Sequence, residues 1–218
     1  MDAIGLIPAR GGSKRVKGKN LRLLDGIPLV AHSILVAQQA GLEVWVSTEN
    51  DEIAGVAKSY GAKVIQRPFK LSLDHVTDFP VIRHALSEVE GDLVVYLRPT
   101  TPFRTVDRVQ EAVRLMSVPG YDSLRSVEEM SESAFKCFRI RAGILQPLTR
   151  GLDVTDRPNQ ELERTYHPNG YVDICRREIV ERGSLWGRGR YPFITLPTVE
   201  IDTEEDFELA EYLTWKRR

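Results

Sequence analysis

Short apolar segments alternate with segments of helical periodicity along the first half of this chain, and few folds accommodate such an alternation. Five apolar segments are expected to form strands, at residues 3–8, 43–47, 63–66, 92–97 and 123–127. Four segments between them are expected to form helices, at residues 28–40, 52–60, 79–89 and 106–116. Strands separated by helices of about ten residues are typical of βαβ units, which place parallel strands in one sheet. The pattern predicts an α/β fold with an open, doubly wound and mostly parallel sheet.

The regular alternation ends near residue 128. Segments 135–140 and 144–148, joined by Arg141-Ala142-Gly143, are expected to form a β-hairpin. Residues 151–164 are polar and show no convincing helical pattern. Regularity returns with an expected strand at 170–175, a helix at 177–182, a short strand at 194–196 and a helix at 204–215. We therefore expect a single domain over residues 1–218, with an arm or lid inserted at 130–165.

Composition narrows the range of partners. The formal net charge of the 218-residue chain is −1, so no strong overall field attracts it to nucleic acid or to a membrane. No apolar run approaches the length of a membrane span, and no basic leader precedes the first strand. The two cysteines, Cys137 and Cys175, lie far apart and are expected to be buried thiols, which suits a reducing compartment. The expectation is a cytoplasmic protein without nucleic-acid or membrane partners.

The loop that follows the first strand is the most informative segment. Residues 7–20 read IPARGGSKRVKGKN, and in an open α/β sheet such a loop lies at the edge where ligands bind. Gly11 and Gly12 permit close approach of the backbone to a ligand, and successive N–H groups can form an anion-binding nest. Five cations accompany them: Arg10, Lys14, Arg15, Lys17 and Lys19. The loop matches neither the hydrolytic P-loop pattern nor the dinucleotide pattern, so it predicts a distinct triphosphate site, with a merely solvated basic loop as the alternative.

This loop and five further segments, in the same order along the chain, resemble the acylneuraminate cytidylyltransferases, or CMP-sialic acid synthetases. The segments are IPARGGSKRVKGKNL at 7–21, VSTE at 46–49, the Arg67-Pro68 pair with Leu71-Ser72, Asp74 and Thr77, RPTTPFR at 98–104, PNG at 168–170 and EIDTE at 200–204. The resemblance covers essentially the whole chain. It implies a Rossmann-like nucleotidyltransferase fold and transfer of CMP from CTP to the anomeric hydroxyl of an acidic nonulosonate, with release of pyrophosphate.

The resemblance also implies roles for individual residues on the nucleotide side. Such a transfer depends on positioning and charge stabilisation, and Arg10, Lys19 and Asp202 carry over as catalytic residues. Nucleotide binding carries over to Ala9, Arg10, Gly11, Ser13, Lys14, Asn20, Arg67, Asp74 and Thr77. Two alternatives stay open at this point: Lys14 as a lysine that faces solvent, and Asp74 as a cap of the helix that follows.

A metal site is expected near the last helix. Glu200 and Asp202 alternate along an extended segment, so their carboxylates point the same way. Two such oxygen donors suit Mg²⁺ (or Mn²⁺), which keeps several waters in its coordination shell. The related family carries Asp where this chain has Glu200, so Asp202 is the firmer ligand. The alternative is that Asp202 or Thr203 simply caps the helix.

A further set of residues is expected to bind the acceptor sugar. Arg98 ends a central strand where sialic acid synthetases carry Gln, and an unpaired cation there would be costly, so it is expected to contact the acceptor or a phosphate unless a structural acid pairs with it. The resemblance adds Arg104, Lys136, Arg157 and Asn169, although Asn169-Gly170 is also a turn signal. It further implies a homodimer in which the arm reaches the neighbouring subunit. A 3-deoxy-octulosonate cytidylyltransferase and a non-catalytic nucleotide-binding module remain as alternatives, and the acceptor sugar is left open.

Overall fold

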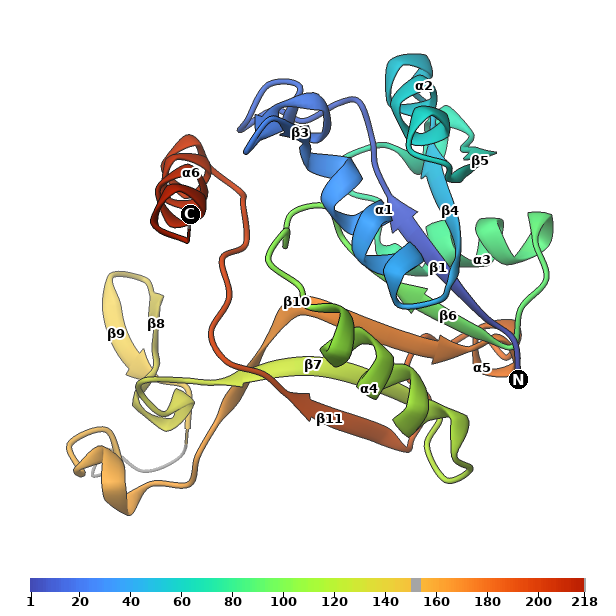
Figure 1. Ribbon diagram of the computed structural model, residues 1–218. Helices are drawn as coiled ribbons and strands as arrows, with labels where there is room; N and C mark the ends of the chain where they lie inside the picture. Colours follow the sequence, from blue (N-terminus) through green and yellow to red (C-terminus); the bar gives the residue numbers. More distant parts are fainter. Residues whose placement is uncertain (150–153, 218) are drawn as a thin grey trace.

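A computed structural model of the protein describes residues 1–149 and 154–217, and its centre is a seven-stranded sheet (Figure 1). The strands follow the order β11-β7-β10-β6-β1-β4-β5. Their bounds are β1 Ala3–Pro8, β4 Glu43–Thr48, β5 Lys63–Gln66, β6 Leu93–Tyr96, β7 Ser123–Glu129, β10 Tyr166–Arg176 and β11 Arg190–Ile194. Strands β6, β1, β4 and β5 run parallel, β10 is antiparallel to β6 and β7, and β11 is parallel to β7. The predicted mostly parallel α/β sheet is confirmed.

Helices cover both faces of this sheet, so its central strands are apolar on both sides. The helices are α1 Leu29–Gln39, α2 Asp51–Ser59, α3 Asp78–Glu88, α4 Val106–Ser117, α5 Arg177–Glu181 and α6 Glu204–Lys216. The core on one face is built with α1, α2 and α4, and the core on the other face with α3 and α5. All four residues of β6 are buried, as a strand between two helical layers requires. Among the described residues, no helix is long and apolar enough to cross a membrane.

Helix α6 packs away from the main sheet, over the base of the loop that follows β1, residues 9–20, which is named the phosphate loop after its predicted role. Phe207 and Ala210 are fully buried in a separate cluster with Val16, Leu24 and Leu29, to which Ile201 also belongs. A small hairpin of β2 Leu23–Leu24 and β3 Ile27–Pro28, which the sequence pattern does not predict, supplies Leu24. This cluster fixes residues 200–203 against the loop, which decides where their carboxylates lie.

The last strand of the sheet begins earlier than predicted. The expected strand at 194–196 is wrong: β11 spans Arg190–Ile194, and Leu196 is 85% exposed. Pairing with β7 fixes this register, and Pro192 is tolerated because β11 is an edge strand. The strand expected at 170–175 extends to Tyr166–Arg176 and shifts register between Pro168 and Asp173, where Gly170 has a φ of 65°.

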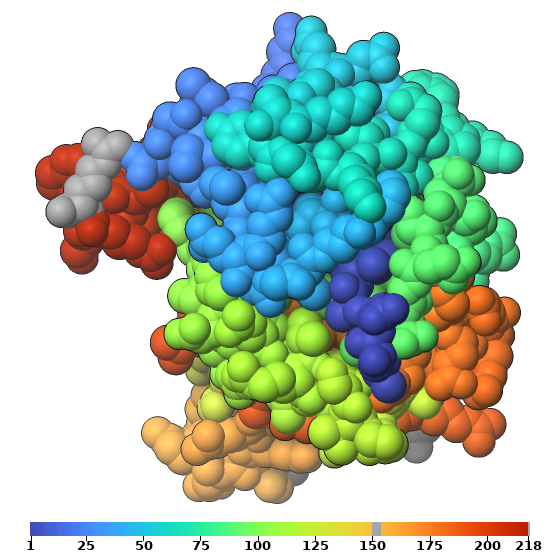
Figure 2. Space-filling model, turned by 45° about the vertical axis from the view of Figure 1, so that its right-hand side comes forward, coloured from blue at the N-terminus to red at the C-terminus, as the bar shows by residue number. Residues whose placement is uncertain are grey.

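Segment 130–165 lies outside the main sheet. Its hairpin consists of β8 Phe138–Arg141 and β9 Ile144–Pro147, and Ala142 and Gly143 both have positive φ, as a two-residue hairpin turn requires. Short 3-10 helices occur at Ala134–Lys136 and Asn159–Glu161. Of the segment predicted to be irregular, 151–164, the first three residues lie outside the described residues. In Figure 2 the residues just before β10, in gold, protrude at the lower edge of the molecule, away from α1 and α2. The predicted hairpin is confirmed; its role as an arm stays a prediction.

Candidate active site

The carboxyl ends of the parallel strands open into a cavity of about 310 Å³. Four chain segments line it: the loop after β1, the segment between β5 and α3, the end of β6 with the residues after it, and residues 200–202. These segments are far apart in the sequence and meet because parallel strands end at one edge of the sheet. Of the predicted site residues, the cavity brings together Arg10, Ser13, Lys14, Lys19, Asn20, Arg67, Asp74, Thr77, Arg98, Glu200 and Asp202.

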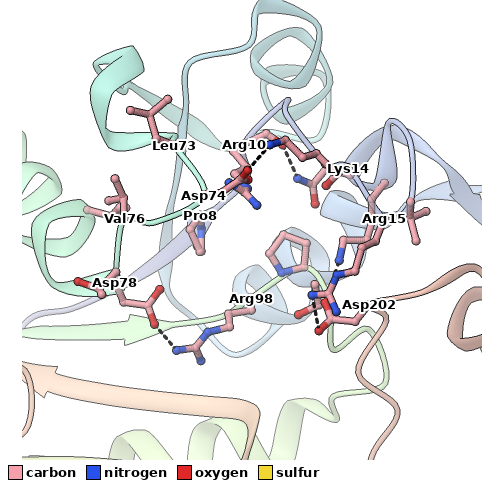
Figure 3. Close-up of a pocket in the computed structure, with 18 of the residues that line it drawn as sticks. Pro8, Arg10, Lys14, Arg15, Leu73, Asp74, Val76, Asp78, Arg98 and Asp202 are labelled. Atoms are coloured by element: carbon pink, nitrogen blue, oxygen red, sulfur yellow. Dashed lines mark hydrogen bonds and ion pairs between the residues drawn. The ribbon is translucent and has the colours of Figure 1, made fainter.

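Asp74 holds two cations of the loop at one side of the cavity (Figure 3). Its Oδ1 lies 2.8 Å from Arg10 Nη1, and its Oδ2 lies 2.5 Å from Lys14 Nζ. The hydrogen bonds from Lys14 and Arg10 lower the pKa of the Asp74 carboxyl. The alternative of Asp74 as a helix cap is wrong, because Thr77 precedes α3 and Asp74 instead points to the loop. Lys14 is largely exposed but is directed into the site by this pair.

Asp202 holds two further loop cations at the other side. Its Oδ1 lies 3.2 Å from Lys19 Nζ, and its Oδ2 lies 3.0 Å from Arg15 Nη2. Lys19 is only 12% exposed and also donates to the Ile201 carbonyl at 2.7 Å. Helix α6 is capped by Thr203 in a capping box with Asp206, which leaves the Asp202 carboxylate to the loop.

Glu49 connects the loop to the segments that follow β4 and β5, a role that the sequence pattern does not predict. The Gly11 N–H donates to Glu49 Oε1 at 2.7 Å, and the Ser72 hydroxyl donates to Glu49 Oε2 at 2.6 Å. A Cβ atom on Gly11 would lie 2.8 Å from Asn50 Nδ2, so the close approach requires glycine. The signal was present, because Glu49 directly follows a buried strand at the ligand-binding edge.

Three predicted nucleotide residues shape the cavity from within the protein. Arg67 is buried and donates its guanidinium to the Ser47 hydroxyl and carbonyl, and burial lowers its pKa. Asn20 is buried and donates to the Arg10 carbonyl at 2.9 Å, which fixes the turn of the loop. Ala9 is fully buried and continues the pairing of β1 with β4 through the Ser47 carbonyl.

The two carboxylates expected to bind a metal both face the cavity. Glu200 accepts from the Thr100 hydroxyl at 3.4 Å, and Asp202 lies beside the loop cations. Burial, and next the charge of Asp202, raise the pKa of Glu200. No cluster of three or more His, Cys, Asp or Glu suited to a metal occurs among residues 1–149 and 154–217. Two carboxylates are the donor set that an ion such as Mg²⁺ takes when it completes its shell with phosphate oxygens and water, so the pair fits the predicted ion, which stays a prediction.

Arg98 lines the cavity beside Asp78 and is paired with two acids. Its Nη2 lies 2.6 Å from Asp78 Oδ2, and its Nη1 lies 2.8 Å from Asp173 Oδ2. The Tyr96 hydroxyl donates to Asp78 Oδ1 at 2.9 Å. Burial opposes the charge of Arg98, but Asp173 and Asp78 together raise its pKa. The structure therefore contains the alternative arrangement, in which structural acids pair with Arg98. Asp173 indicated it in the sequence, because an acid within an apolar strand needs a partner.

The other predicted acceptor residues lie outside this cavity. Arg104 is buried, and its guanidinium donates to four carbonyls and to the Ser33 hydroxyl; burial lowers its pKa to about 9. Asn169 is buried and joins Glu128 to Thr195. Lys136 stands at the base of the hairpin and Arg157 is exposed in the segment after it. The structure gives Arg104 and Asn169 internal partners, which explains their residue types without a ligand.

Comparisons with known proteins point to one family. A cytidylyltransferase family model matches residues 4–141. The chain is 34% identical to the CMP-N,N'-diacetyllegionaminic acid synthase of Legionella pneumophila, over 98% of this chain and 96% of that protein. It is 31% identical to the N-acylneuraminate cytidylyltransferase of Escherichia coli, over 98% of this chain but only 52% of that longer protein. The fold of a CMP:2-keto-3-deoxy-manno-octonic acid synthetase solved with CTP superposes with a TM-score of 0.77, at 20% identity over the full length of both chains. The family model over residues 4–141 and the 34% identity to a synthase of this kind along nearly its whole length show that the chain, with its cation-lined cavity at the sheet edge, belongs to the cytidylyltransferase family.

Proposed function

We propose that this protein transfers CMP from CTP to the anomeric hydroxyl of an acidic nonulosonate sugar. The observation that carries the proposal is one cavity of about 310 Å³ lined by four loop cations, of which two are paired with Asp74 and two with Asp202. Similarity to a diacetyllegionaminic acid synthase over nearly the whole chain supports a nonulosonate as the acceptor. Legionaminate, neuraminate and related sugars all share the carboxylate and the anomeric hydroxyl that this reaction needs.

In the proposed reaction the sugar oxygen bonds to the α-phosphorus of CTP. The bond from that phosphorus to the bridging oxygen breaks, pyrophosphate leaves with the electron pair, and the hydroxyl proton passes to solvent. Arg10 and Lys14 are placed to exchange Asp74 for phosphate oxygens, and Lys19 to neutralise charge as the bond breaks. Arg67 and Asn20 hold the loop and the neighbouring strand ends in place.

The proposal includes a divalent cation held by Asp202 and Glu200. When bound, Mg²⁺ or Mn²⁺ would act as a Lewis acid on the phosphate oxygens. We expect that chelation abolishes pyrophosphate release and that added Mg²⁺ restores it. Asp202→Asn should raise the Mg²⁺ concentration for half-maximal rate by about 10- to 100-fold, whereas Glu205→Gln, on exposed helix surface, should not. An unchanged Mg²⁺ requirement in Asp202→Asn would show that Asp202 does not hold the metal ion.

The direct test is pyrophosphate release with CTP, Mg²⁺ and a panel of eight- and nine-carbon acidic sugars. Release with a nine-carbon sugar supports the proposal and names the acceptor. Release only with 3-deoxy-octulosonate would replace the proposed acceptor by that eight-carbon sugar. CTP binding by calorimetry without release for any sugar would favour a nucleotide-binding module instead.

We further propose that the protein acts as a homodimer and in the cytoplasm. Support for the dimer comes from the hairpin, which exposes Ile140, Ile144 and Leu145 at 60–73% of their surface. Apolar side chains gathered on one projecting element mark an interaction site. Light scattering at micromolar concentration should give twice the chain mass, and a monomeric mass would contradict the dimer.

A further inference from the structure

One wall of the cavity, formed by Asp78, Tyr96 and Arg98, contains an acid to which the proposed reaction gives no role. Asp78, at the start of α3, lies on the opposite side of the cavity from Arg10 and Lys14 (Figure 3). Its side chain is 40% exposed, and each carboxylate oxygen accepts one described hydrogen bond, from Tyr96 or from Arg98. Because a carboxylate oxygen can accept two hydrogen bonds, Asp78 keeps acceptor capacity toward the cavity.

Arg98 is not free to leave this arrangement. Its other nitrogen is paired with Asp173, whose side chain is only 5% exposed. If Arg98 turned to a substrate, Asp173 would be left as a buried charge with no cation beside it, which is strongly unfavourable. Arg98 also lies over the Tyr96 ring, with its Cζ 4.9 Å from the ring centroid. The guanidinium therefore serves as a fixed brace between two acids.

The charge of this wall decides which part of a substrate can face it. Asp78 and Asp173 contribute two negative charges, which Arg98, paired with both acids, and the nearby Arg67 balance. A sugar carboxylate would add a further negative charge here, whereas the four loop cations are paired with only two acids and suit it better. Hydroxyl and amide N–H groups, by contrast, are the donors that an exposed carboxylate binds well.

Arg98 links Asp78 to the end of β6, beside the carboxylates where transfer is proposed. Arg98 follows β6 and is two residues from Thr100, whose hydroxyl contacts Glu200. The wall is thus continuous with the carboxylates beside which transfer is proposed. The segment between β5 and α3, which precedes Asp78, completes this side of the cavity with Arg67, Leu73 and Val76.

We propose that Asp78 recognises the acceptor sugar by accepting a hydrogen bond from one of its neutral donors, either a hydroxyl or an acylamino N–H. Arg98 and Tyr96 are positioning residues that fix the Asp78 carboxylate. The inference rests on the proposed function, and it assigns acceptor recognition to Asp78 rather than to direct contact by Arg98. It also orients the sugar, with its carboxylate toward the phosphate loop and its neutral donors toward β6.

Steady-state kinetics of Asp78→Asn with CTP and the sugar that wild-type enzyme uses provide the test. Loss of a hydrogen bond to a charged group should raise KM for the sugar by about 10- to 100-fold, with KM for CTP changed less than about twofold. Glu43→Gln, an exposed acid at the far end of β4, is the control and should match wild type. An unchanged KM for the sugar overturns the inference, and so does a rise confined to CTP, which would place Asp78 at the ribose or base.

A double-mutant cycle tests the brace. Arg98→Gln alone strands two acids and can unfold the chain, so it is paired with Asp173→Asn. In the variant that carries Arg98→Gln and Asp173→Asn, the further change Asp78→Asn should raise KM for the sugar by less than about threefold, because Arg98 no longer fixes the Asp78 carboxylate. A full-sized effect there would overturn the positioning role of Arg98. If wild-type enzyme releases no pyrophosphate with any sugar, the proposed function fails and this inference with it; turnover with unaltered variant kinetics overturns the inference alone.

Discussion

Strands β6 and β8 are both four residues long, and they show how differently the two parts of this chain gain their stability. Every residue of β6, LVVY, is buried between two layers of helices. Every residue of β8, FRIR, is exposed, although two of its four side chains are large and apolar. The sheet satisfies its apolar side chains within one chain, whereas the hairpin leaves them on the surface. The candidate active site lies at the edge of the main sheet, whereas the proposed dimer depends on the exposed hairpin.

The largest expected effect lies at the site, where function can be lost without loss of the fold. We expect Lys19→Ala to lower kcat for pyrophosphate release by about 10²- to 10³-fold, the usual cost of removing one charge-stabilising donor. Lys17→Ala, in the same loop but exposed and outside the cavity, should retain the wild-type rate. Thermal denaturation of both variants serves as the folding control. Equal rates for the two variants would contradict the assignment of Lys19.

The opposite result is expected in the sheet. Leu93, in β6, is fully buried, and Leu93→Ala should lower the free energy of unfolding by about 2–5 kcal/mol through the cavity it leaves. Urea denaturation followed by circular dichroism measures this. The variant should keep the same molecular mass in its folded state. A loss below about 1 kcal/mol would mean that the core on this face collapses around the missing side chain.

The hairpin should respond in the reverse way. Ile140→Asp with Ile144→Asp places charge on two exposed apolar positions and should convert the proposed dimer to a monomer in light scattering. Its circular dichroism spectrum should not change, since neither side chain packs in the sheet. Lys70→Asp, an exposed site on η2 Phe69–Leu71, should leave the mass unaltered. A double variant that keeps the wild-type mass would move the interface elsewhere.

The smallest effect distinguishes the two thiols. Burial raises the pKa of Cys175 in β10 to about 12, so at pH 8 only about one thiol in 10⁴ is ionised in the folded chain. In a Cys137→Ser variant we expect only slow reaction with a thiol reagent until urea unfolds the protein and exposes Cys175. Below the pKa, each unit rise in pH should increase the slow folded-state rate about tenfold. Fast labelling of the folded variant would show that β10 opens locally.

The sequence predicts the sheet better than the contacts at its edge, for physical reasons. Burial on both faces leaves a continuous apolar run such as that of β6, which is readable from one segment alone. The start of β11 depends on its pairing with β7, a long-range contact that no local pattern encodes. Asp78 and Asp173 acquire their importance from Arg98, which lies 20 and 75 residues away, so the three were not linked before the structure brought them together. The same applies to Arg104, because an arginine suits a ligand as well as it suits the four carbonyls to which it donates.

Under the proposed function, the contact of Gly11 with Glu49 means that the phosphate loop has little left to order when nucleotide arrives. Fixing a backbone costs about 1–2 kcal/mol of conformational entropy per residue, and here folding meets much of that cost in advance. The Ser72 hydroxyl donates to the same carboxylate and extends this rigidity to the segment between β5 and α3. Affinity for the triphosphate then depends in part on Glu49, a negative residue that would never touch it.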